Sequence, residues 1–279
     1  MGVDAWSYQL HSREPNIFPL KMIEITWKET DIDTEDWDET DRMKFAFLCG
    51  FLTHLAADQI VYPVVNSIAG PYYKKLGARD EHRRCEVHQD LYALAMSLGS
   101  RLPIDTFREQ AFGSWCSVQP DALWTEKAVW FRHLIEKAFV EAHAVTPGEE
   151  AIGHWIKGTV TTLQHCIHLS LFGHGLFGPY GTAYRNLFDS SGVLKPKDAA
   201  FRKYIGLEGL NTGRTYDAYW DEAAELATIY IQAAFRVYCA NNIDDTLRQN
   251  FRQVVCSADL GSPLEKGVLQ AARQALSAW

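Results

Sequence analysis

The stretch FAFLCGFLTHLAADQIVYP, residues 45–63, decides the fold class. Its apolar side chains recur at three- and four-residue steps, which is the period of an α-helix with one buried face. These side chains are Phe45, Leu48, Leu52 and Leu55. The pattern extends over 41–69 and ends at Gly70 and Pro71, while Pro63 is expected to kink the helix or end its first part.

Helical periodicity is also found in most of the rest of the chain. Residues 1–28 contain Pro15 and Pro19, which break any long helix, and 175–215 predict a long ordered loop or two short helices. Strand signals are nearly absent. Helices are expected over 79–98, 104–116, 121–143, 149–174, 217–242, 244–257 and 263–278. We therefore predict a single all-α domain over 1–279, in which 1–100 bear the metal ligands and 101–279 are a helical elaboration covering the site.

Composition narrows the class of protein. The chain has 279 residues, 47% hydrophobic and 22% charged, as in soluble globular proteins. Its net charge of −8 argues against binding a nucleic acid polymer. We see no membrane span, secretory signal or CxxC motif, so a cytoplasmic location with reduced, mostly buried cysteines is expected. The expected partner is a small-molecule substrate, and a homo-oligomer is allowed.

Two helices each carry a histidine and a carboxylate four residues apart. His54 and Asp58 lie in the apolar stretch, and His82 and Glu86 lie in the charged segment that follows. This spacing places both side chains on one helix face, and imidazole with carboxylate is a ligand set for zinc, iron or manganese. One such pair alone is usually a hydrogen bond or a solvated pair, so the metal interpretation depends on having two.

Other histidines leave alternatives open. His165 and His168 share a helix face and could complete the site, or they could be hydrogen-bonded core residues, as could His154 and His174. His88 falls on a different face from His82 and is expected to be a surface residue or to support the ligands from behind.

The full pattern resembles the zinc-dependent phospholipase C family, which is related to the S1/P1 nucleases. Gly-x-x-x-His-x-x-x-Asp-x-x-x-Tyr-Pro occupies 50–63, and His-x-x-x-Glu-x-x-x-Asp occupies 82–90. The segment near Asp4 looks like the family's amino-terminal ligand segment, and His11 falls where a further histidine ligand is expected. The resemblance covers 2–98 and implies an all-α phospholipase C/P1 nuclease-like bundle with a helical C-terminal extension.

The resemblance also implies a ligand set. A first ion would take Asp4, His11, His54 and Asp58, and a second would take His82 and Glu86. The chain departs from the family at Tyr62, where the family has histidine, because tyrosine is a poor zinc ligand at neutral pH. We therefore expect one or two zinc ions, with iron or manganese as alternatives.

Three functions are compatible with these residues. The first is a metal-dependent hydrolase of a phosphoester or related small ester, in which Asp4 or Asp58 orients a metal-activated water or acts as general base. The second is a metalloenzyme of different chemistry in secondary metabolism on the same scaffold. The third is a degenerate relative that binds an apolar ligand among its many aromatic side chains.

Overall fold

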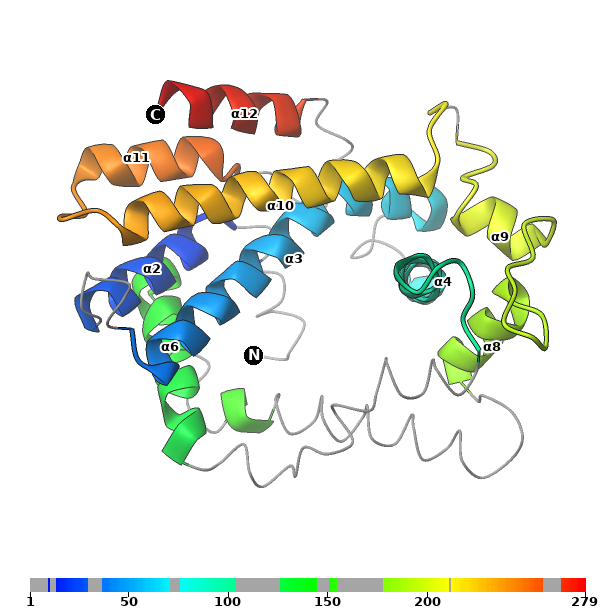
Figure 1. The fold of residues 1–279 in the computed structure, drawn as a ribbon, viewed down its shortest axis with the longest axis horizontal. Coiled ribbons are helices and arrows are strands. Elements are labelled where there is room, and N and C mark those ends of the chain that lie inside the picture. The colour runs from blue at the N-terminus through cyan, green and yellow to red at the C-terminus, as the bar shows by residue number, and fades with distance from the viewer. Residues whose placement is uncertain are drawn as a thin grey trace. The chain divides into compact units, whose positions relative to one another are not determined.

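The structure is a computed structural model that describes residues 10, 14–29, 37–70, 76–103, 126–144, 151–154, 178–210, 212–257 and 267–279. These residues form helices, with no strand among them and only two isolated backbone bridges. The predicted all-α class is confirmed for this part of the chain. The helices of Figure 1 form two compact units, which are described one at a time. The predicted single domain, with the metal ligands in 1–100 and a covering elaboration in 101–279, stays a prediction.

Unit 1 is assembled from three separated stretches of chain, Met1–Val64, Glu126–Ile152 and Tyr219–Trp279. Helix α2 (Ile17–Glu29) packs against α6 (Glu126–His143) and against α11 (Asp245–Val254), and α11 packs against α12 (Val268–Ala278). Figure 1 shows α2 beside α6 and α11 beside α12. The described part of unit 1 is thus a set of helices that share one apolar core.

Aromatic rings fill the centre of unit 1. The ring of Phe18 lies 4.9 Å from that of Phe139 and 5.2 Å from that of Phe51, in tilted arrangements that favour ring–ring attraction. The fully buried Tyr230 donates a hydrogen bond of 2.5 Å from its hydroxyl to Gln59 Oε1 and accepts one from the backbone N–H of Cys256. The Gln59 amide in turn donates to the carbonyl oxygen of Cys256 at 2.8 Å. These bonds satisfy polar groups that burial would otherwise leave unsatisfied.

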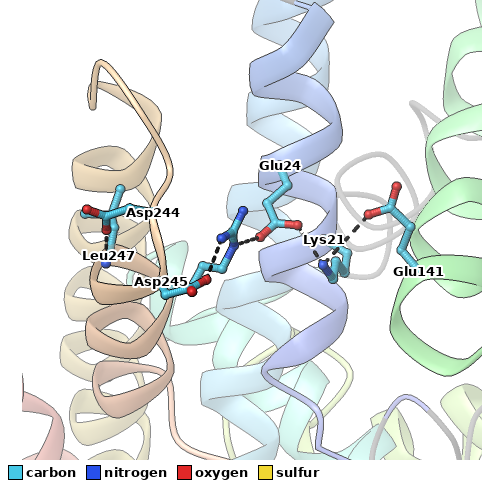
Figure 2. Close-up of polar contacts among 7 residues, drawn as sticks. Lys21, Glu24, Glu141, Asp244, Asp245 and Leu247 are labelled. Atoms are coloured by element: carbon cyan, nitrogen blue, oxygen red, sulfur yellow. Dashed lines mark hydrogen bonds and ion pairs between the residues drawn. The ribbon is translucent and has the colours of Figure 1, made fainter.

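A chain of alternating charges links three helices of unit 1, as Figure 2 shows around Glu24. The carboxylate of Glu24, 5% exposed, accepts hydrogen bonds from Lys21 Nζ at 2.7 Å and from Arg248 Nε at 2.6 Å. Arg248 also donates to Asp245, and Lys21 lies 3.9 Å from Glu141. Burial alone would raise the pKa of Glu24, but its bonds to the two cations lower it below the ordinary value.

Helix α2 corrects a prediction. Pro15 and Pro19 were expected to prevent a long helix over 1–28, yet α2 covers Ile17–Glu29. Pro19 is its third residue, where the backbone nitrogen has no hydrogen-bond partner within the helix, so the missing N–H costs little.

The long helices follow the predicted pattern. The expected helices at 41–69, 79–98 and 217–242 correspond to α3 (Glu39–Ala69), α4 (Leu76–Ser97) and α10 (Tyr216–Tyr238). Helices α6, α11 and α12 likewise match, and α8 (Gly178–Leu187) and α9 (Ala199–Tyr204) are the two short helices expected within 175–215. The segment 104–116 and most of 149–174 lie outside the described residues, and 151–154 are helical.

Helix α3 continues past Pro63 to Ala69 instead of ending there. The Asp38 side chain caps the start of α3 by accepting a hydrogen bond of 2.8 Å from the Asp41 N–H. By length and composition, α3 is the one helix in the described ranges that could cross a membrane, a property that the core helices of soluble proteins share. Leu52, Leu55 and Ala56 are buried in its middle.

Unit 2 comprises Val65–Thr125 and Gly153–Ala218. Helix α4 packs against α8 and α9, which also contact each other. The loop between α8 and α9 folds back on the segment after α4. There Gly192 has φ of +75°, and its carbonyl oxygen accepts a hydrogen bond of 2.9 Å from the Leu102 N–H. An added Cβ at Gly192 would meet the Leu102 oxygen at 2.5 Å. Only glycine fits this approach without strain.

Candidate functional site

The first predicted ligand pair lies on α3 in unit 1. His54 Nε2 is 3.3 Å from Asp58 Oδ2. The side chain of Asp58 is 7% exposed and that of His54 is 52% exposed, so a buried carboxylate is paired with an imidazole that reaches solvent. The helical spacing of four residues produces this contact, as predicted.

The second pair lies on α4 in unit 2 and has the opposite burial. His82 Nε2 is 3.1 Å from Glu86 Oε1, with the histidine 2% exposed and the glutamate 35% exposed. Here the imidazole belongs to the core of unit 2 and the carboxylate faces outward. Asp90, one turn further along the helix, is exposed.

Within each pair, the distance between the nitrogen and the oxygen suits two ligands of one metal ion. Two ligands bound at about 2.1 Å to a tetrahedral ion are separated by about 3.4 Å. The nitrogen–oxygen separations of 3.3 and 3.1 Å are close to this value. Each pair can therefore supply two ligands with little movement, and a stable site needs further ligands from elsewhere.

The remaining predicted ligands fall in parts of the chain that the structure does not describe. Asp4, His11, His165 and His168 lie outside the described residues, and no group of three metal-capable side chains occurs within them. Tyr62 lies on α3 one turn after Asp58 and is half-buried. The two pairs belong to different units, so the six-residue ligand set stays a prediction.

Unit 2 contains a cavity that the sequence analysis missed. Its volume is about 680 Å³, and it lies where α4, α8 and α9 meet. Polar and charged side chains form much of its lining, namely Asp80, Arg83, Arg84, His88, Asn186 and Lys203. The four-residue spacing of Asp80, Arg84 and His88 was a visible signal of a common helix face. The residues from α8 and α9 carried no such signal.

His88 is not the surface residue that one expectation describes, because it is 4% exposed and lines this cavity. The alternative, that His88 supports the ligands from behind, stays a prediction. Its Nδ1 lies 2.6 Å from the carbonyl oxygen of Arg84. A carbonyl only accepts, so Nδ1 carries the proton and the Nε2 of the neutral ring accepts from the Asn186 amide at 3.3 Å. Burial lowers the pKa of His88, and this effect exceeds the raising effect of the Arg84 carbonyl. The lowered pKa favours the neutral ring at pH 7.

Glu81 accepts hydrogen bonds from Tyr204 and Lys203, which line the cavity beside His88. The ring of Tyr204 lies 4.4 Å from the His88 ring, and its hydroxyl donates to Glu81 Oε1 at 2.9 Å. Lys203 donates to the same carboxylate oxygen. Burial alone would raise the pKa of Glu81, but the bonds from Lys203 and Tyr204 lower it, so the carboxylate is ionised at neutral pH. Glu81 therefore fixes both Tyr204 and Lys203 beside the cavity.

No protein-family model, curated protein or solved structure matches this chain. The resemblance to the zinc-dependent phospholipase C family accordingly depends on the motifs at 50–63 and 82–90 and on the geometry of their side chains.

Proposed function

We propose that this protein is a metal-dependent hydrolase of a phosphoester or related small ester, built on a phospholipase C/P1 nuclease-like helical bundle. The observation that carries the proposal is the presence of two helical histidine–carboxylate pairs, each with the separation expected of two ligands on one ion. A pair formed only for helix stability would not need the core position of His82 or of Asp58.

In this proposal His54 and His82 provide neutral imidazole ligands, and Asp58 and Glu86 provide carboxylate ligands. Asp4 and His11 complete the set, as the motif resemblance implies. A bound zinc, iron or manganese ion would lower the pKa of water and offset negative charge on the ester. Asp58 additionally orients the attacking water and accepts its proton at a carboxylate oxygen, a role that Asp4 shares as the alternative base.

The experiment is metal analysis combined with activity. The protein is purified without chelators, its zinc, iron and manganese are measured by plasma mass spectrometry, and hydrolysis of an aryl phosphodiester and an aryl phosphomonoester is followed. We expect at least one equivalent of metal and a measurable rate. His54→Asn and His82→Asn should each lower both metal content and rate by about tenfold or more.

The matched control is His133→Asn, because His133 is an exposed histidine of α6 that forms no such pair. It should leave metal content and rate unchanged. Less than one equivalent of metal in the wild-type protein contradicts the proposal. Full metal occupancy without turnover of either ester favours a metalloenzyme of different chemistry instead.

A further inference from the structure

The cavity of unit 2 lies on a different side of α4 from the predicted metal ligands. In a helix of 3.6 residues per turn, His82 and Glu86 point within about 40° of each other. Asp80, Arg84 and His88 cluster on the opposite half of the same helix, and Arg83 lies between the two sets, about 60° from Glu86. The cavity therefore has no ligand pair in it, and an inference about it does not depend on the proposed function.

The cavity is locally cationic in an acidic protein. Among the described lining residues, Arg83, Arg84 and Lys203 carry positive charge, and Asp80 carries the one negative charge. Glu81 pairs with Lys203 and also lies 3.9 Å from Arg84. With Glu81 counted, the described residues of the cavity still carry one net positive charge, whereas the whole chain carries −8. Among the described residues Arg83 forms no ion pair, so its guanidinium is available to a ligand.

Hydrogen bonds fix two buried polar side chains of the lining, His88 and Tyr204. His88 is fixed by the Arg84 carbonyl and by Asn186, and Tyr204 is fixed by Glu81. The neighbouring Ala199 and Ala200 are small, and Tyr204 is the one large ring among the lining residues that the structure describes, so this part of the lining offers little to a lipid chain. A volume of about 680 Å³ is that of a site for a small molecule.

We propose that this cavity is a second ligand site, which binds a small molecule through a phosphate or carboxylate group held by the guanidinium groups of Arg83 and Arg84. Guanidinium groups bind both oxyanions through paired N–H donors, which defines the shared chemistry. The fixed Asn186 amide and His88 ring contact the rest of the ligand. The two sources, a phosphorylated metabolite and a carboxylic acid, are separated by the experiment.

The experiment is calorimetric titration of the full chain at low ionic strength with inorganic phosphate and, separately, with succinate. We expect saturable binding of at least one of the two. Arg83→Gln should weaken it by about tenfold, because one charge-assisted contact is lost at a partly exposed position. Asp80→Asn should tighten it, since it removes a carboxylate that lines the cavity and repels an anion. A general loss of structure would not produce these opposite changes.

The matched control is Arg202→Gln, which removes the same charge from α9 at an exposed position outside the cavity and should leave affinity within about twofold. Chelation of metal before the titration should also leave binding unchanged. Binding of phosphate alone or succinate alone supports the inference and identifies the source. Absence of binding of either anion, insensitivity to Arg83→Gln, or loss of binding on chelation overturns it, the last because the anion would then occupy the metal ligands.

Discussion

The ion pairs of the buried Glu24 make the substitution Glu24→Gln a direct test of how burial changes the strength of an ion pair. The glutamine keeps the shape of the side chain but loses the charge that accepts from Lys21 and Arg248. Hydrogen bonds to charged groups contribute about 1.5–3 kcal/mol each. The two cations are 26% and 38% exposed and regain water when the carboxylate is lost, so the expected cost is about 2 kcal/mol in the free energy of unfolding.

The assay is urea denaturation of both proteins at pH 7, and the matched control is Glu225→Gln. Glu225 pairs with Arg273 in two bonds of 2.6 and 2.5 Å, which are as short as those of Glu24, but both side chains are nearly half exposed. An exposed pair is worth at most about 1 kcal/mol, and less at high salt. Equal costs for the two substitutions would refute the reasoning that burial decides the strength.

The stability from Glu24 also depends on pH with a defined sign. Its pKa is lower in the folded than in the unfolded protein, so its contribution is present above the unfolded value of about 4.3 and is lost as the pH falls through the folded value. The difference between wild type and Glu24→Gln should therefore shrink in acid. A difference that grows as the pH falls would contradict this assignment.

Three further predictions concern buried contacts. Gly192→Ala should cost at least about 2 kcal/mol because its Cβ meets backbone atoms, whereas Gly213→Ala, also at positive φ but in open space, should cost about 1 kcal/mol in the same denaturation assay. Tyr230→Phe should cost about 2 kcal/mol because the buried Gln59 amide oxygen and the partly buried Cys256 N–H both lose the hydroxyl; a cost below about 0.5 kcal/mol would show that the hydroxyl bonds contribute little. Iodoacetamide at pH 8 should label the exposed Cys239 and spare Cys85, whose pKa burial raises, as peptide mass spectrometry would detect; equal labelling would contradict the burial of Cys85.

Much of the helical structure followed from local pattern. Helix α3 was predicted within two residues at its start because its apolar period is long and uninterrupted, and the His54–Asp58 contact followed from spacing alone. Helix α2 was missed because Pro19 was interpreted as a breaker without regard to its place in the first turn. The error concerned position within the helix, which residue type alone does not specify.

The cavity of unit 2 could not be predicted in the same way. Its two halves are more than eighty residues apart in sequence, with Arg83 on α4 and Lys203 on α9. His88 appears on the charged helix as one more polar residue, and its burial depends on Tyr204 packing over its ring. Such a site comes from tertiary contact, whereas the histidine–carboxylate pairs come from the helix itself.

The interrupted chain path of unit 1 has a consequence for how the protein is made. A ribosome delivers Met1–Val64 early and Tyr219–Trp279 last, whereas both stretches of unit 2 have been synthesised once Ala218 emerges. The nascent chain can therefore finish unit 2 while α2, which can already pack against α6, still lacks α11. Limited proteolysis of ribosome-stalled chains ending on either side of residue 219 would reveal this order, with additional protection of α2 expected in chains that extend well past it.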